Sequence, residues 1–338
     1  MGGVPVPDAT QWDQIERVAD GGSVVLTPLE GLAAQGELID QDDTPVRILS
    51  LLKANRHAQA RAEAMGGARA TERTGMYPTA WVVRYGEQTI CLYYAGRAHA
   101  GENLEALLPK READHGKPLV MSDALTSHEA DETALMRCHC LAHGRRQFSA
   151  LEDVFPDECT VVSDALKQVF DHDDQAEEPQ LRAQERLAYP QAYSGPIMEG
   201  LKRWLETQCA ERLVEPKSSL GKARSSLLGH WETLTRFLSV PGAPLDNNTV
   251  ERALNRFMRQ RNNSLCYATE SSAYIASVLT SLIATCLHAG VNALESLVAW
   301  QEHRSAVFRD PAAWVPWSSQ ATLVPPASRC CPSSAIWA

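Results

Sequence analysis

The strand-forming patterns of this chain all precede Ala142, and helical periodicity follows almost without interruption. Gly86-Glu87 separates two apolar runs, as is typical of a hairpin. An early mixed sheet followed by many helices predicts an α/β protein whose sheet is flanked by helices. The predicted strand segments are residues 37–50, 79–85, 89–95, 118–123 and 135–141.

Helices are predicted before and after the strand-rich part. Residues 10–35 and 99–109 have early helical patterns, whereas residues 54–75 are rich in Ala, Arg and Gly and predict a loop. The tail from Arg309 has no periodicity, and we predict that it is irregular. The clearest late helices are predicted at residues 218–239, 248–262, 271–289 and 292–308.

Composition narrows the class of protein. Of the 338 residues, 44% are hydrophobic and 22% are charged, which is typical of a soluble globular protein. We expect no membrane span and no secretion signal, because long apolar runs and a basic leader are absent from the sequence. Nine irregularly spaced cysteines favour a reducing cytoplasm over a disulfide scaffold. A net charge of −10 excludes a simple nucleic-acid coat, but an enzyme with a local basic track remains compatible with it.

Three acidic residues occupy positions that suggest metal chemistry. Asp42 interrupts a strand pattern, Asp123 ends another strand, and Glu251 begins a helix. Acids at strand ends and helix starts can converge at one edge of an α/β sheet. Three converging carboxylates suit Mg²⁺, a hard ion that is completed by water and substrate phosphates.

Each acid also has a purely structural interpretation. Asp42-Asp43-Thr44-Pro45 reads equally well as a turn, and Asp123 could cap a strand end. Glu251 lies in a first helical turn, where the helix dipole favours an acid. Asn247 or Asn248 is a natural N-cap for the same helix.

Arginines accompany these acids. Arg252, Arg256 and Arg259 share one helical face by their i, i+4, i+7 spacing, and Arg261 follows them. An alternative is a solvated helix whose arginines pair with nearby acids. In contrast, residues 152–178 contain ten acids and one lysine, so we expect that face to be solvated and turned away from DNA. The candidate phosphate contacts are Arg145, Arg146, Arg252, Arg256, Arg259 and Arg261.

At these residues the chain resembles the transposases of the insertion sequence 66 family. The shared motifs occur in family order over roughly residues 10–305. No single motif is decisive, but the ordered set is specific. The motifs include Asp42-Asp43-Thr44-Pro45, Met121-Ser122-Asp123-Ala124-Leu125, Cys140-Leu141-Ala142-His143-Gly144-Arg145-Arg146 and Leu245-Asp246-Asn247-Asn248 with Glu251-Arg252.

The resemblance implies an RNase H-like catalytic core with a DDE triad that holds two Mg²⁺ or Mn²⁺ ions. Matched motif to motif, the triad is Asp42, Asp123 and Glu251, which would be both catalytic residues and metal ligands. Asp43 takes the place after the first aspartate and is a supporting candidate. The long interval between Asp123 and Glu251 leaves room for a large all-α insertion before the last catalytic helix.

The patterns and the resemblance together divide the chain into five parts. The expected parts are a helical lead-in at residues 1–36, an RNase H-like core at 37–150, a helical insertion at 151–240, a catalytic and core-packing helical region at 241–308 and an irregular tail at 309–338.

Cys140 and His143 form a Cys-x-x-His motif that resembles one found after the second aspartate in several DDE transposases. A zinc site would need four nitrogen or sulfur ligands, and the sequence offers no second pair at finger spacing. We therefore favour a packed Cys140 beside a His-Gly-Arg-Arg phosphate contact, with zinc as the alternative.

The implied function is a cytoplasmic transposase of a bacterial insertion sequence, which cleaves DNA and transfers the freed strand. Its expected partners are transposon ends and target DNA, a homo-oligomer formed on DNA, and accessory proteins of the same element, but no membrane. The alternatives are a nuclease that only hydrolyses DNA and a non-catalytic remnant that binds DNA or a partner.

Departures from the family favour the remnant. Arg261-Asn262-Asn263 stands where Arg-Lys-Asn is usual, so a phosphate-binding lysine is missing. The tail after about residue 315 also departs from the family pattern. The chain begins where relatives have already passed an N-terminal DNA-binding segment, which we interpret as truncation.

Overall fold

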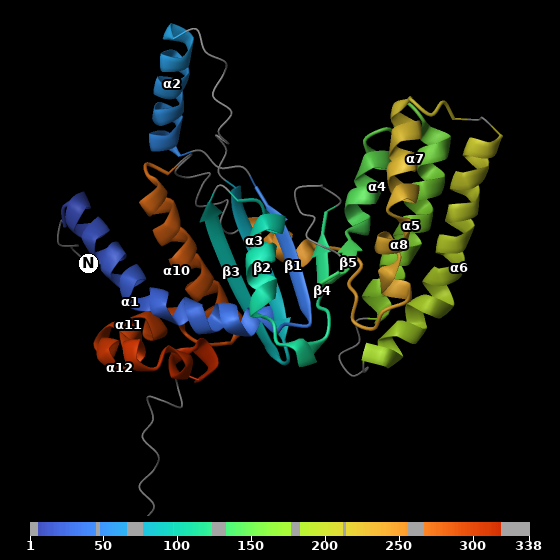
Figure 1. The fold of residues 1–338 in the computed structure, drawn as a ribbon. Helices are drawn as coiled ribbons and strands as arrows, with labels where there is room; N and C mark the ends of the chain where they lie inside the picture. Colours follow the sequence, from blue (N-terminus) through green and yellow to red (C-terminus); the bar gives the residue numbers. More distant parts are fainter. Residues whose placement is uncertain are drawn as a thin grey trace, which may run out of the picture.

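The computed structural model describes residues 6–44, 48–65, 77–96, 98–123, 133–176, 183–211, 214–255 and 267–318. Within these residues, a five-stranded sheet is flanked by helices, and a second group of helices, α4 to α8, lies beyond the β5 edge of the sheet (Figure 1). This arrangement confirms the predicted mixed sheet with flanking helices.

The sheet has the order β3-β2-β1-β4-β5. β2 is antiparallel to both β1 and β3, whereas β4 is parallel to β1 and β5 is parallel to β4. The hairpin between β2 and β3 turns at Gly86, whose φ of 54° lies in the left-handed region that favours glycine. The strands are β1 (Leu38–Asp43), β2 (Tyr77–Tyr85), β3 (Gln88–Gly96), β4 (Leu119–Ser122) and β5 (Met136–His139).

The helices agree with most of the sequence patterns, and the helix at residues 248–255 contains Glu251. The predicted helix at 218–239 is divided into α7, α8 and the short 3-10 helix η4 (Arg236–Leu238). The longer helices are α1 (Asp8–Ala34), α2 (Leu49–Ala64), α3 (Ala100–Leu107), α4 (Leu141–Ser149), α5 (Pro156–Ala176), α6 (Ala183–Ala210), α7 (Ser219–Gly229), α8 (Trp231–Leu234), α10 (Glu270–His288), α11 (Ala293–Glu302) and α12 (Arg304–Arg309).

Two segments differ from the sequence prediction. Residues 49–64 form helix α2, although the sequence predicts a strand over residues 37–50 and a loop over residues 54–75. Alanine, leucine, lysine and arginine are strong helix formers, and this segment contains neither glycine nor proline. The expected irregular tail begins with an ordered part, because the 3-10 helix η5 (Pro311–Trp314) packs into the core and its Trp314 backbone accepts a hydrogen bond from Trp300 Nε1 at 3.0 Å.

The two faces of the sheet have different coverings. Ile39, Trp81 and Val83 point to the face that packs with α1 and α3 in the main hydrophobic core. On the other face, Ala80 and Val82 pack against the helix at residues 248–255. Asp42 pairs with Ala80 and Asp40 pairs with Val82 across the β1–β2 register, so both acids share this second face.

Helix α10 covers the outer edge of β3. The Cys91 N–H donates to Thr285 Oγ1 at 3.1 Å, and the Thr285 hydroxyl donates to the Cys91 carbonyl at 3.1 Å. The Tyr93 N–H donates to Ser281 Oγ at 2.8 Å. These hydroxyls satisfy backbone groups that an edge strand would otherwise expose for pairing with another chain.

We expect Thr285→Val to lower the free energy of unfolding by about 2–3 kcal/mol, because it removes the hydroxyl that makes two buried hydrogen bonds to the N–H and C=O of Cys91. Thr285→Ser keeps the hydroxyl and is the matched control. Urea denaturation measures both changes. A Thr285→Val variant as stable as the unchanged protein would show that the hydroxyl contributes nothing.

Among the described helices, α10 alone is long and apolar enough to cross a membrane by length and composition. Half of its apolar window is buried inside the protein, where it packs with β3 and α1. We therefore interpret α10 as a helix of the protein core.

Helices α4 to α8 have their own hydrophobic cluster. Phe148 of α4, Val162 of α5, Leu201 of α6 and Leu227 of α7 are buried in it. Helix α4, which lies within the expected core at residues 37–150, contacts both parts: Leu141 and Phe148 are buried in this second cluster, whereas Ala142 packs with Leu38 and Leu119 of the sheet. Several acids of α5, such as Asp157 and Asp164, are exposed, in agreement with the predicted solvated face.

Candidate active site

Asp42 and Asp123 lie at the carboxyl ends of neighbouring parallel strands. The β1–β4 register pairs Leu38 with Leu119 and Asp40 with Met121. Continued along both strands, the same register brings Asp42 level with Asp123. Neighbouring strands lie about 4.8 Å apart, and level residues of parallel strands point to the same face. The two aspartates therefore lie at the same end of the sheet, at the carboxyl ends of neighbouring strands.

Glu251 approaches from the helix that covers this face. Its Oε1 lies 3.6 Å from Nε2 of His143 on α4. His143 and Asp123 line the same cavity of about 130 Å³. His143 thus contacts the glutamate and shares a cavity with the second aspartate.

Several polar atoms around Glu251 are buried without a partner. Among the residues that the structure describes, none donates a hydrogen bond to the buried Oε1 of Glu251, and Nδ1 of His143 and the side-chain amide of Asn247 are also unpartnered. A buried carboxylate oxygen without a donor is costly unless a cation satisfies it. Three carboxylates form the all-oxygen donor set that Mg²⁺ and Mn²⁺ prefer, so the residues fit such ions.

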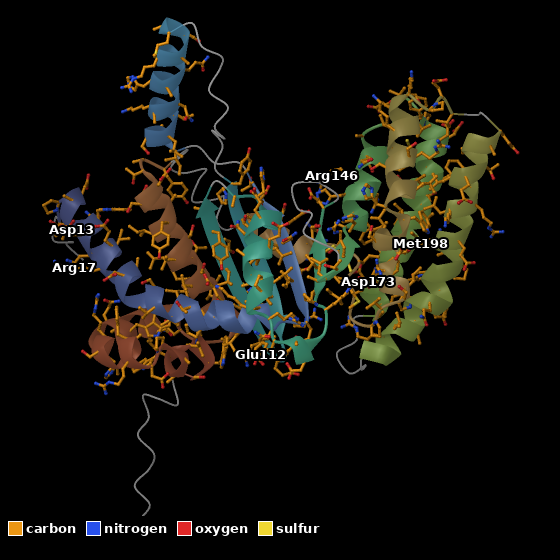
Figure 2. The ribbon with its side chains drawn as sticks, in the orientation of Figure 1. Asp13, Arg17, Glu112, Arg146, Asp173 and Met198 are labelled. Atoms are coloured by element: carbon orange, nitrogen blue, oxygen red, sulfur yellow. The ribbon has the colours of Figure 1, made fainter. Side chains whose placement is uncertain are left out.

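The three carboxylates are not packed into a single tight cluster. Within the described residues, one group of three potential ligands has all its donor atoms within 4.8 Å of one another, and it consists of Glu112, Asp114 and His115. These exposed residues lie on or beside η2 (Ala113–His115), before β4, whereas Asp123 follows β4. Figure 2 shows Glu112 at the lower end of the sheet and Arg146 at the upper end. The sequence interpretation passed over this group, although its close spacing was visible.

Asp43 points away from Asp42 and fixes helix α3. Its Oδ2 lies 2.9 Å from His99 Nδ1 and accepts from the Ala100 N–H at 3.3 Å. The His99 ring also packs on Tyr77, with 3.8 Å between ring centroids. The backbone N–H of Asp43 donates to Asp42 Oδ1 at 2.8 Å, so the anchored Asp43 orients its neighbour.

Cys140 is buried directly before α4. Burial raises the pKa of its thiol to about 11, although backbone hydrogen bonds from Asn247 and His143 oppose this effect. Cys140 is 2% exposed and packs with Leu38, Leu119 and Met121. This burial is what the packed interpretation expects, and the zinc alternative stays a prediction.

The candidate DNA-binding arginines are only partly placed. Arg145 is half-buried and Arg146 is exposed on α4, where Arg146 Nη1 lies 3.3 Å from His143 Nε2. Arg252 is exposed on the helix of Glu251. Arg256, Arg259 and Arg261 lie outside the described residues.

The expected capping role of the asparagines needs correction. The helix begins at Asn248, and the preceding Asn247 is fully buried, but its amide caps nothing. Asp246 takes this role, because its Oδ1 accepts from the Asn248 N–H at 3.0 Å and its Oδ2 accepts from the Asn248 side chain. Asn247 contributes through its backbone, whose carbonyl accepts from the Glu251 N–H at 3.1 Å.

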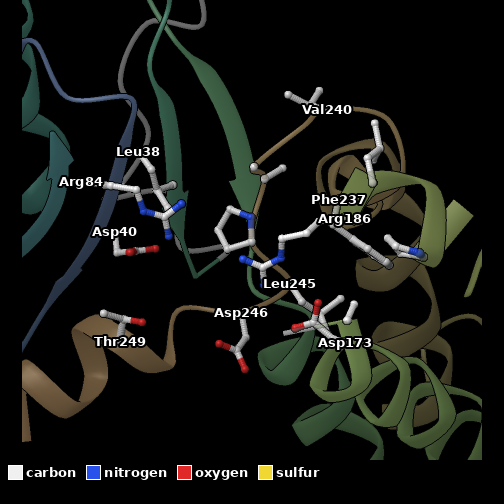
Figure 3. A pocket seen from close by; sticks show the side chains of 16 residues that line it. Leu38, Asp40, Arg84, Asp173, Arg186, Phe237, Val240, Leu245, Asp246 and Thr249 are labelled. Carbon is white, nitrogen blue, oxygen red and sulfur yellow. The ribbon is translucent and has the colours of Figure 1, made fainter. Parts of the chain in front are cut away.

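Asp40 is an acidic residue that the sequence interpretation missed. It is 6% exposed and lines a cavity of about 300 Å³ with Arg84, Asp246 and Arg186 (Figure 3). Burial raises its pKa to about 7, partly offset by Arg84, and the negative charge of Asp246 raises it further. The period of two along β1 places Asp40 on the same face as Asp42, and that period was the available signal.

Comparison with known proteins gives the family. The model of the family described as "Transposase IS66 family" matches residues 1–274. The match covers well over half of the chain, so this protein belongs to the IS66 family of transposases.

Two curated relatives come from Sinorhizobium fredii. "Uncharacterized protein y4hP" is 28% identical over 212 residues, which cover 58% of this chain and 37% of that protein. "Uncharacterized protein y4jD" is 30% identical over 161 residues, which cover 46% of this chain and 30% of that protein. The chain thus spans about a third of the length of these relatives. No solved structure matches it.

Proposed function

We propose that this protein is a DDE transposase, in which Asp42, Asp123 and Glu251 hold two Mg²⁺ or Mn²⁺ ions and support DNA cleavage and strand transfer. The observation that carries the proposal is the β1–β4 register, which, when continued, brings Asp42 level with Asp123 beneath the helix of Glu251. Membership of the IS66 family supports the same assignment.

The architecture supports an RNase H-like core. A mixed five-stranded sheet carries the two aspartates, and α4 to α8 occupy the interval between Asp123 and Glu251. Such an interval is what an all-α insertion before the last catalytic helix would require.

The proposal places two ions among these carboxylates. Their donor atoms do not all lie within 4.8 Å of one another, which leaves room for more than one ion. Two bound ions about 4 Å apart would activate an attacking oxygen and stabilise a leaving oxygen.

The neighbouring residues have supporting roles in this proposal. Asp43 orients Asp42 through its backbone N–H, and His143 lies between Glu251 and Arg146. Arg145, Arg146 and Arg252 would bind the phosphate backbone without reading base sequence. The protein would act in the cytoplasm, as a homo-oligomer on transposon ends and target DNA, with accessory proteins of its element.

A non-catalytic remnant is the second candidate. It is favoured by Asn262, which stands where the resemblance places a phosphate-binding lysine. A remnant would bind DNA or a partner transposase without cleaving DNA.

The deciding experiment incubates the full chain with a duplex bearing its element's terminal repeat, with Mg²⁺, Mn²⁺ or EDTA. We expect metal-dependent cleavage at the repeat and, from a pre-cut end, joined products in target DNA. Cleavage without joined products would support a hydrolytic nuclease. DNA binding that is the same with and without metal, and that is not followed by cleavage, would support the remnant.

A further inference from the structure

None of the described residues covers helix α2. It is 16 residues long and contains no buried residue. Figure 1 shows it standing away from the sheet and from the other helices. An isolated helix of this length is marginal in water, because most helical stability in proteins comes from packing. A partner that contacts α2 would supply the stabilising contacts that the described part of the chain does not provide.

The surface of α2 is basic in an acidic protein. Lys53, Arg56 and Arg61 oppose a single acid, Glu63, whereas the whole chain has a net charge of −10. Lys53, His57 and Arg61 follow an i, i+4, i+8 spacing on one face, with Arg56 beside them. We call these four residues the α2 stripe. Within the described residues, no acid pairs with any of its cations.

The base of α2 is fixed beside α10 and the end of β3. The Leu49 N–H donates to the Tyr267 carbonyl at 2.9 Å, and the Ser50 N–H donates to the Ala268 carbonyl at 3.2 Å. Ile48 is buried against Ala273 of α10. Ala95 of β3 packs at this base and lies next to Tyr94, which is level with Thr79 and Asp43, so α2 starts at the same end of the sheet as the carboxyl end of β1.

We propose that the α2 stripe binds the phosphate backbone of duplex DNA that passes the candidate active site. The inference rests on the proposed function and adds a DNA-contacting surface outside the residues matched to family motifs. The charge of the stripe is complementary to DNA, and its cations extend over about 12 Å of helix, enough to reach several phosphates. Such contacts hold the duplex in place without reading its sequence.

The test compares two triple variants with the same change in charge. Lys53→Gln/Arg56→Gln/Arg61→Gln neutralises the stripe and keeps good helix formers in α2. The matched control neutralises three exposed cations elsewhere, Lys117→Gln/Lys167→Gln/Arg309→Gln. Binding to a fluorescent duplex of unrelated sequence is measured by anisotropy over a range of salt concentrations, and circular dichroism checks the helix content.

We expect the stripe variant to bind roughly tenfold or more weakly at low salt, with the slope of log K against log salt reduced by about 2–3 because up to three phosphate contacts are lost. The control should stay within about twofold of the unchanged protein. A stripe variant with unchanged affinity and slope would overturn the proposal. So would a change in oligomeric state without a change in DNA affinity, because it would assign α2 to a second copy of the chain.

Cleavage at saturating DNA separates this inference from the proposed function. The stripe variant should retain metal-dependent cleavage once DNA is bound, because the three carboxylates are untouched. If the stripe variant cleaves DNA normally and its DNA affinity is unchanged, the α2 proposal is wrong but the proposed function is not affected. If the unchanged protein binds no DNA, both the α2 proposal and the proposed function are wrong.

Discussion

Asp123→Asn is expected to reduce metal-dependent DNA cleavage by on the order of a thousandfold or more, equivalent to about 4 kcal/mol in the activation barrier. The amide keeps the size of the side chain but removes the negative charge that would bind a divalent cation. Asp123 is only 9% exposed. Water from the solvent therefore has little access to take the place of the lost carboxylate oxygen as a metal ligand. Cleavage rates under single-turnover conditions measure the effect.

Three further measurements make this result specific. Glu251→Gln should give a loss similar to that of Asp123→Asn, and both variants should bind duplex DNA as the unchanged protein does. Asp114→Asn is the matched control, because Asp114 belongs to the exposed Glu112-Asp114-His115 group at the opposite end of β4. Loss of cleavage in Asp114→Asn with retention in Asp123→Asn would transfer the metal site to that group.

The sequence was sufficient to select Asp42 and Asp123 as candidate metal ligands, but it was insufficient to predict that they lie level with each other on neighbouring strands. Asp42 was recognisable as an acid within a strand pattern and Asp123 as an acid at a strand end, and the sequence interval between them could be counted. Paired residues of β1 and β4, such as Leu38 and Leu119, are separated by the same number of residues as Asp42 and Asp123. This match depends on how α2, the β2–β3 hairpin and α3 fold between the two strands. Register is a tertiary property, because it follows from the packing of both strands on the same helices.

The features that the sequence did not reveal depend on distant contacts or on their absence. Helix α2 buries nothing, so it has no apolar periodicity, and its helix-forming composition was the only signal. Asp40 looked like an ordinary strand residue because the groups around it, Asp246 and Arg186, come from distant parts of the sequence. Trp314 lay in a segment without periodicity, but the Trp300 side chain and the main core hold it in place.

Asp40→Asn is expected to stabilise the protein by about 4 kcal/mol above pH 7, with an effect that disappears below about pH 4. The pKa of Asp40 is about 7 in the folded protein and about 3.9 in an unfolded chain. Because the folded value is the higher one, the folded state binds the proton more tightly, and stability falls as pH rises from about 4 to about 7. Asparagine resembles the protonated carboxyl group and cannot ionise, so the Asp40→Asn protein does not lose stability as the pH rises. Urea denaturation of both proteins between pH 4 and pH 8 measures the difference.

Arg84 provides the second arm of this experiment. The positive charge of Arg84 lowers the pKa of Asp40, so Arg84→Gln should move the upper end of the pH window above 7. In an Asp40→Asn background, the same Arg84→Gln substitution should leave no such shift. An Asp40→Asn protein that is less stable than the unchanged chain at pH 8 would contradict the prediction, because it would mean that a charged Asp40 pairs favourably with Arg84 inside the cavity.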